Sequence, residues 1–311
     1  MIALERYAPL LFLLMWSSGA IFVKLGLEDA SVSVFLTIRA AGAALALFFV
    51  CWLISRVDGL RELLVLPRRL LFRALWIGVL IQAGYQSAYF LALDYQMTPG
   101  VLAIVLGLQP ILTPVMANER IGRAGYAYLA VGFAGLTTAV LGAREVGALT
   151  GLGLLFALVA VVSISAGSVM QQRSVIHPVA SAFYQTLTAA CLFLLALPFT
   201  TIRLDVTGEF VMAAVWMIVV VSTCAVLLLF HMLTRKAASQ VGVLFYLVPV
   251  VTVVLDYLAF GNEISWLTLV GALLIIMAVK GFSRVRFLNA AVCANVRALA
   301  CDGSRRDKEP K

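Results

Sequence analysis

An internal repeat constrains the fold of this chain more than any other feature. The stretch from residue 97 to residue 142 returns, in most of its pattern, at residues 237 to 281. Each copy consists of an apolar run interrupted by a proline, a short loop with a glutamate, and a second apolar run rich in small residues. A repeat of this length sets the unit of the architecture. We therefore expect two halves built on the same plan.

The composition places both halves in a membrane. Of the residues, 63% are hydrophobic and only 12% are charged, whereas soluble domains contain roughly 25% charged residues. A spanning helix needs about 20 apolar residues, and a chain segment in lipid must be helical to satisfy its backbone. Ten apolar runs meet these requirements, with approximate limits at 8–24, 33–54, 72–93, 98–117, 124–142, 151–171, 178–199, 211–233, 238–260 and 265–282. The predicted fold class is all-α integral membrane.

The first run has an alternative interpretation as a secretory signal peptide, because small residues follow Trp16 near a suitable cleavage position. Two observations favour a permanent helix instead. The positive segment that a signal peptide needs is weak, since Glu5 cancels Arg6. In addition, residues 17–21 align with residues 165–169 of the sixth run. A cleaved segment would have no reason to match an internal helix.

The distribution of positive charge predicts the orientation. Most of the 23 lysines and arginines lie in the loops of one face or in the C-terminal tail, and such residues mark the cytoplasmic side. We therefore expect an inner (cytoplasmic) membrane protein with both termini in the cytoplasm. Because five spans per half is an odd number, the second half must enter the membrane upside down. The expected units are a five-helix repeat at 1–145, an inverted five-helix repeat at 146–283 and a basic cytoplasmic tail at 284–311.

A polar stripe runs along the third apolar run. Its members are spaced by three and four residues, so they project from one face of a helix; they are Gln82, Tyr85, Gln86 and Tyr89. Because an amide buried without a partner costs a few kcal/mol, the stripe must face protein or water. We predict that it lines a substrate cavity. The alternative is hydrogen bonding between helices.

Two prolines occupy equivalent positions in the repeat, Pro110 and Pro249, which are 139 residues apart. A proline inside a helix removes one backbone hydrogen bond and displaces the carbonyl four residues earlier. Such breaks line the substrate site of many transporters, and a kink needed only for packing is the alternative. Four further aromatic or amide side chains within the spans are predicted to contact substrate: Trp16, Gln109, Tyr184 and Tyr246.

Two charged residues lie inside the spans at similar depth below the outer face, Arg39 in the second run and Asp256 in the ninth. An isolated charge at that depth is costly, and pairing of Arg with Asp offsets the cost. We therefore expect an ion pair at an outer gate, with separate snorkelling to the headgroups as the alternative. Asp256 is also the candidate residue for proton coupling.

Other functional classes find little support in the sequence. No HExxH pair and no phosphate-binding loop occur, and no nucleophile stands beside a base, so neither catalysis nor a metal or cofactor is expected. The basic residues are distributed as a membrane face requires, which argues against binding of nucleic acid. The expected partners are a small-molecule substrate and the lipid bilayer. The sequence leaves open whether the chain is a monomer or a homodimer.

The order of these features, in duplicate, resembles the EamA family of the drug/metabolite transporter superfamily. The segments that carry the resemblance are residues 16–20, Arg39, residues 88–95, and the proline-to-glutamate stretches 110–119 and 249–263. The resemblance covers nearly all of residues 8–282, and it implies ten helices with both ends cytoplasmic. Two departures occur in the first half: Asn118 replaces the usual glycine before the glutamate, and the proline-to-glutamate stretch is five residues shorter than in the second half.

The resemblance implies export of amino acids and other small metabolites. We therefore expect a secondary transporter that works by alternating access, with amino acids or related amines as substrates. A drug or quaternary-cation exporter is one alternative, in which the rings of Trp16, Tyr85 and Tyr89 hold the cation; it requires few cationic residues near the site. A non-transporting membrane receptor or scaffold is the other alternative, and it would need neither an inverted repeat nor a polar midplane.

Overall fold

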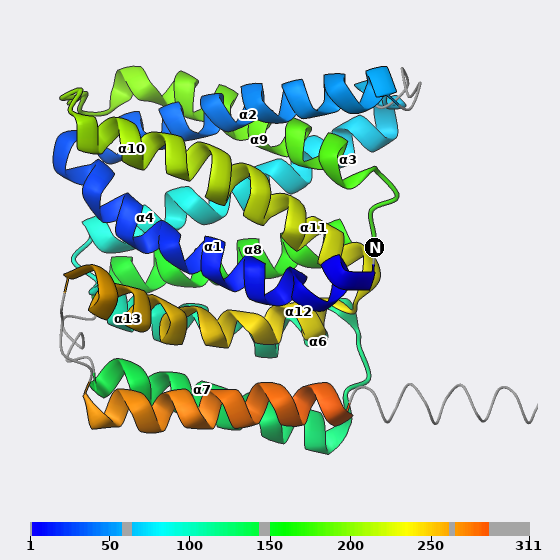
Figure 1. Cartoon of the computed structure of the whole chain (residues 1–311), viewed down its shortest axis with the longest axis vertical. Helices are drawn as coiled ribbons and strands as arrows, with labels where there is room; N and C mark the ends of the chain where they lie inside the picture. The colour runs from blue at the N-terminus through cyan, green and yellow to red at the C-terminus, as the bar shows by residue number, and fades with distance from the viewer. Residues whose placement is uncertain (1, 58–63, 143–149, 261–264, 286–311) are drawn as a thin grey trace, which may run out of the picture.

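A computed structural model describes residues 2–57, 64–142, 150–260 and 265–285 of the chain. Within these residues the fold is all-helical, and the only β-type pairing is one isolated bridge between Ala30 and Leu204. The long helices lie side by side across the view of Figure 1. The N-terminus and the end of the last described helix, Trp266–Val285, lie at the same end of this bundle (Figure 1).

The helices follow the predicted runs closely. The first half contains α1 (Ile2–Asp29), α2 (Val32–Val57), α3 (Arg68–Gly78), η2 (Val79–Gly84), α4 (Tyr85–Asp94), α5 (Pro99–Leu106), α6 (Gln109–Ala117) and α7 (Gly122–Gly142). The second half contains α8 (Gly151–Gln172), α9 (Pro178–Ala196), η3 (Leu197–Phe199), α10 (Gly208–Trp216), η4 (Met217–Ala225), α11 (Val226–Arg235), α12 (Ala238–Gly242), η5 (Val243–Tyr246), α13 (Leu247–Phe260) and the last helix, Trp266–Val285.

In the described part of the chain, nine helical stretches are long and apolar enough to cross a membrane. The predicted span that is not among them is the run at 72–93. It folds as one continuous helical stretch formed by α3, η2 and α4, but its polar stripe makes it less apolar than the other nine. Large apolar side chains cover the outside of the bundle, and Leu45, Phe72, Leu195 and Leu258 are each 70–72% exposed. The chain is therefore a multi-pass membrane protein.

Capping residues explain where several helices begin and end. The hydroxyl of Thr150 accepts a hydrogen bond from the backbone N–H of Gly153 at 3.1 Å, which caps α8. The hydroxyl of Thr207 accepts one from the N–H of Phe210 at 3.0 Å, which caps α10. At the other end of a helix, Asn118 adopts a left-handed conformation with φ of 56° and terminates α6.

The two halves carry the same irregularities at equivalent positions. Each contains a stretch of wider π-helical turns, η2 in the first half and η4 in the second. When η2 is shifted by the 139 residues that separate the two prolines, it falls within η4. Each half also interrupts its proline-containing helix just before the proline, between α5 and α6 and at η5. π-helical turns occur frequently at functional sites.

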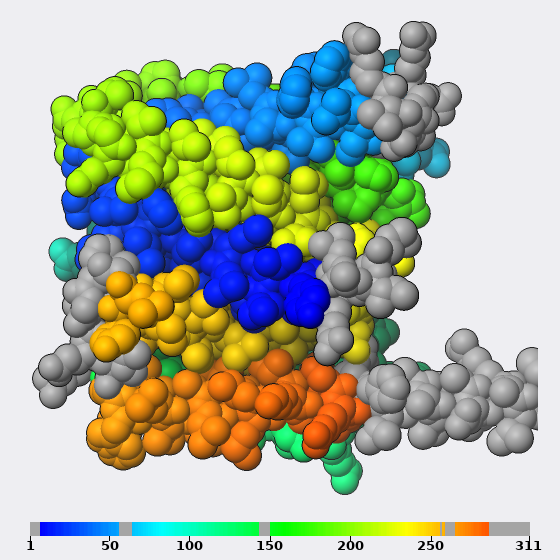
Figure 2. Space-filling model, in the orientation of Figure 1, coloured from blue at the N-terminus to red at the C-terminus, as the bar shows by residue number. Residues whose placement is uncertain are grey.

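Helices of the first half pack mainly against helices of the second. The helix pairs with the most extensive contacts include α2 with α9, α4 with α8, and α1 with both α10 and α13. Figure 2 shows α1 in blue, lying on this face between the yellow-green α10 and the orange α13. The two halves are therefore interlocked, and α1 is an integral helix of the bundle.

Candidate functional site

The polar stripe lies in the middle of the continuous α3–η2–α4 helix. Gln86 donates a hydrogen bond from Nε2 to Oε1 of Gln82 at 2.9 Å. The rings of Tyr85 and Tyr89 meet edge to face, with 6.1 Å between their centroids. Gln82 is buried, with 6% of its surface exposed, while the other three side chains keep part of their surface accessible. Neighbours four residues apart thus contact one another along one face.

Arg39 reaches the stripe from α2. Its Nε donates a hydrogen bond to the hydroxyl of Ser222 at 2.8 Å, and its charge interacts electrostatically with Tyr85. Ser222 lies in η4, and the repeat offset of 139 residues relates it to Ala83, which adjoins Gln82. Arg39 therefore links η4 with the polar stripe of α4. Ser222 was not predicted from the sequence, although the repeat offset could have pointed to it.

Trp16 of α1 packs against two aromatic rings. Its ring lies 5.3 Å from that of Phe12 and 5.7 Å from that of Phe245, centroid to centroid. Trp16, Tyr85 and Phe245 all pack against one large cluster of buried apolar side chains, to which helices of both halves contribute. Trp16 thus lies in a largely aromatic environment, and its contact with substrate stays a prediction.

The two broken helices cross next to each other. A Cβ atom built on Gly242 of α12 would lie 3.8 Å from Cα of Pro110 and 3.9 Å from the side chain of Thr113 in α6. Gln109 precedes this crossing and is 5% exposed. Pro249 follows the 3-10 turn η5 and is partly accessible in α13. Both predicted breaks are thus present, and they bring backbone of the two halves into close approach.

Two predicted site residues lie elsewhere. The hydroxyl of Tyr184 donates a hydrogen bond to the carbonyl of Leu64, in the connection that follows α2. The hydroxyl of Tyr246 donates to the carbonyl of Leu129 in α7 at 3.1 Å, and the side chain is completely buried. The structure therefore does not bring Tyr184 or Tyr246 to the stripe; it gives both hydroxyls backbone partners between helices.

The predicted ion pair at an outer gate involves Asp256, whose side chain lies outside the described residues. Arg39 lies on α2, which packs mainly against α9 and η4. Asp256 belongs to α13, which packs mainly against α1. Figure 1 shows α1 and α10 between α2 and α13. Among the described residues Arg39 donates a hydrogen bond to Ser222, and its ion pair with Asp256 stays a prediction.

At one end of the bundle, polar contacts tie the two halves together. The carboxylate of Glu119, which follows α6, accepts hydrogen bonds from the backbone N–H of Ser239 at 3.3 Å and from its hydroxyl. Beside it, Arg173 donates to the carbonyl of Ala117 at 2.7 Å, and Arg73 donates to the carbonyl of Arg173 at 3.0 Å. This end carries the loops that are basic in sequence. The sequence had marked Glu119 only as part of a loop, because its partner is 120 residues away.

The opposite end is tied by backbone contacts between the α1–α2 turn and the connection before α10. The N–H of Ser31 donates to the carbonyl of Arg203 at 2.9 Å, and the N–H of Asp205 donates to the carbonyl of Asp29 at 2.7 Å. The guanidinium of Arg203 donates to the carbonyl of Glu28 at 2.7 Å. Both ends of the bundle are thus bridged by contacts between the halves.

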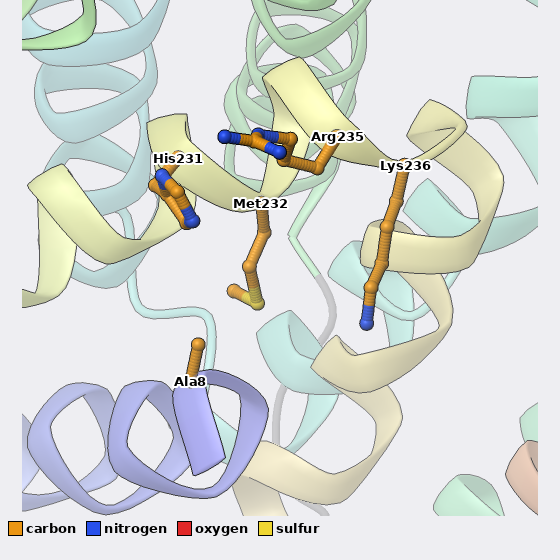
Figure 3. Close-up of a pocket in the computed structure, with 5 residues that line it drawn as sticks. All are labelled: Ala8, His231, Met232, Arg235 and Lys236. Atoms are coloured by element: carbon orange, nitrogen blue, oxygen red, sulfur yellow. The ribbon is translucent and has the colours of Figure 1, made fainter. Parts of the chain in front are cut away.

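A cavity of about 240 Å³ lies near the start of α1 and the end of α11, at the end of the bundle that holds the N-terminus. Figure 3 shows its lining, with His231, Met232 and Arg235 on α11, Ala8 on α1, and Lys236 directly after α11. None of these residues belongs to the stripe, so this cavity is separate from the candidate site.

Comparisons with known proteins agree with the fold. Residues 151–284 match the sequence model of the EamA-like transporter family. None of the curated proteins matches the chain significantly. Among solved structures, 29 chains match. One of them, titled only as the crystal structure of a protein, has a TM-score of 0.75 at 23% identity, and the alignment covers 90% of this chain and 97% of that one.

The structural match supports the fold alone, and the family match covers residues 151–284, less than half of the chain. Nine apolar helices of spanning length lie in the described residues, so the chain is a multi-pass membrane protein, and its residues 151–284 are similar to the EamA-like transporter family, which belongs to the drug/metabolite transporter superfamily.

Proposed function

We propose that this protein is a secondary transporter of the inner membrane that exports small metabolites, amino acids or related amines, by alternating access. Its ten spans form two inverted five-helix halves with both termini in the cytoplasm. The observation that carries the proposal is the crossing of the two broken helices, α6 and α12, one from each half. Discontinuous helices at the interface of two repeats form the substrate site in many transporters.

Three observations support ten spans rather than nine. The α3–η2–α4 stretch is continuous over 68–94 and long enough to cross a bilayer. Its polar stripe faces protein, through Gln82 and through Arg39 near Tyr85, so its low hydropathy does not exclude it from the membrane. The two ends of the described chain lie at the same end of the bundle (Figure 1), as an even number of spans requires.

The two ends of the bundle support alternating access. Transport requires that contacts between the halves open first at one end and then at the other. The Glu119–Ser239 contact and the contact between Arg203 and the α1–α2 turn each join one half to the other, at opposite ends. Each contact is polar and consists of only a few hydrogen bonds, so it can break and re-form at a modest cost in free energy. The stripe lies between them.

A flux assay tests the proposal. Purified full-length protein is reconstituted into liposomes, and counterflow of radiolabelled amino acids and amines is measured against liposomes without protein. We expect saturable counterflow of at least one member of the panel. A receptor or scaffold would give no counterflow with any of them, even when circular dichroism shows that the reconstituted protein is folded.

A further inference from the structure

We propose that Arg39, held by Ser222 and adjacent to Tyr85, binds a carboxylate of the transported substrate. This inference rests on the transport function proposed above and names the class of substrate. It assigns Arg39 a role different from the ion pair expected from the sequence. It also decides between the two transport alternatives, since a site built on a guanidinium disfavours a quaternary cation.

The hydrogen bonding of Arg39 leaves the two terminal nitrogens of its guanidinium available to a ligand. Its Nε donates to Ser222 Oγ at 2.8 Å. In the part of the chain that the structure describes, this is the only hydrogen bond of Arg39, so Nη1 and Nη2 have no protein acceptor there. The hydrogen bond that Nε donates to Ser222 restrains the plane of the guanidinium. Two parallel N–H donors in a fixed plane match the two oxygens of a carboxylate.

The charge of Arg39 has no anionic partner among the described residues. The residue lies about seven positions inside α2, roughly 10 Å along the helix at 1.5 Å per residue. Its described neighbours, the hydroxyl of Ser222 and the phenol of Tyr85, are neutral partners. A cation at this depth is costly unless an anion neutralises its charge or water solvates it. A substrate carboxylate would supply the missing negative charge, so binding of the substrate also removes the cost.

Accessibility is consistent with a ligand-facing position. Arg39 and Tyr85 lie deep among the helices, yet each keeps part of its side chain accessible. From Tyr85 the stripe continues to Gln86 and to the ring of Tyr89. A ligand anchored by its carboxylate at Arg39 would therefore extend its remaining groups along an amide and an aromatic face. Rings of this kind accommodate both an ammonium group and an apolar side chain.

The test uses the reconstituted full-length protein and three matched sets of probes. These are the amino acids, the same compounds as carboxamides, and the corresponding decarboxylated amines, with tetraethylammonium as the quaternary cation. Counterflow is measured for each set with the unchanged protein and with Arg39→Gln and Arg39→Lys. Arg123→Gln, the same substitution at an exposed position in α7, is the control. Size-exclusion profiles establish that every variant is folded.

We expect counterflow of at least one amino acid and a rate at least about tenfold lower for its amide and its amine, because a paired carboxylate and guanidinium are replaced by an unpaired charge. Arg39→Gln should raise the apparent KM for that amino acid at least about tenfold and remove the preference over the amide. Arg39→Lys keeps the positive charge but not the two parallel N–H donors of the guanidinium. It should therefore retain part of the preference that Arg39→Gln removes, which would show that Arg39→Gln does not act through misfolding.

Two outcomes would overturn the inference, and they are distinguishable. If amines or tetraethylammonium are carried as well as amino acids, and Arg39→Gln leaves the preference unchanged, the carboxylate site is refuted while transport stands. If no probe of any charge shows counterflow with folded protein, the proposed function itself fails and the inference falls with it.

Discussion

Gln86 shows how an amide is held inside the bundle and still keeps capacity to bind. One of its N–H groups donates to Oε1 of Gln82 at 2.9 Å. An amide side chain has two donors and one acceptor oxygen, so the second N–H and the oxygen of Gln86 are left for another partner. Beside it, Tyr89 offers an aromatic face and touches Tyr85 edge to face. Contacts with Gln82 and Tyr85 thus hold Gln86 and Tyr89 in positions where they can contact substrate.

Substitution in the stripe should therefore affect transport more than folding. We expect Gln86→Ala and Tyr89→Ala each to lower the initial rate of counterflow roughly tenfold, the effect of about one hydrogen bond or ring contact to a polar substrate. The amount of folded protein in the membrane should be unchanged. Tyr126→Ala, which removes a ring that is 41% exposed on α7, is the control. A parallel fall in abundance and activity would show that the stripe serves only packing.

At this scale the sequence predicted what local spacing determines. The stripe follows from spacings of three and four residues, and its members do contact each other. The partner of Arg39 does not follow from spacing, because Ser222 is 183 residues away on another helix. Tyr184 and Tyr246 look like site residues in the sequence, but their hydroxyls find backbone carbonyls of distant segments. Only tertiary packing decides such cases.

At the scale of the helices, α7 and the last helix approach each other most closely at glycines of their backbones. A Cβ atom on Gly271 would lie 2.5 Å from the carbonyl oxygen of Gly135 and 2.5 Å from the backbone nitrogen of Ala139. Backbone atoms cannot rotate away as a side chain can. In lipid, where apolar contact alone does not drive association, small residues allow this close van der Waals packing.

Gly271→Ala should consequently separate these two helices. The overlap is with backbone, so we expect a destabilisation of about 1–3 kcal/mol, in the range of overpacked cores, and a lower melting temperature of the purified protein in detergent. Gly151→Ala is the matched control, because a Cβ atom there meets nothing within 4 Å. An unchanged melting temperature for Gly271→Ala would contradict the packing of this pair.

The helices themselves were largely predictable, whereas their irregular turns were not. Apolar runs of spanning length must be helical in lipid, so the ten run limits lie close to the observed helices. The proline breaks follow from the missing N–H. The π-helical segments η2 and η4 carry no residue type that marks them in the sequence. They become evident only in the structure, and their matching positions then support the repeat.

At the scale of the whole molecule, the proposed transporter crosses the membrane an even number of times in one fixed orientation. In the proposed orientation, with both termini in the cytoplasm, the connection between α9 and α10 faces outward and the connection between α8 and α9 faces the cytoplasm. We expect a cysteine at Thr201, in a background without the five native cysteines, to react with an impermeant maleimide in intact cells. A cysteine at Ser174 should react only after permeabilisation. The reverse pattern would invert the orientation inferred from the positive charges.

The central claim is that the two halves move against each other around the stripe. A reversible cross-link between the halves tests it most directly, at the contact of Glu119 with Ser239. Both residues are replaced by cysteine in the cysteine-free background, and a short, thiol-cleavable bifunctional reagent is added to proteoliposomes. We predict that counterflow stops on cross-linking and returns on reduction, while each single-cysteine variant is unaffected by the reagent. Full counterflow with both cysteines cross-linked would contradict alternating access between these halves.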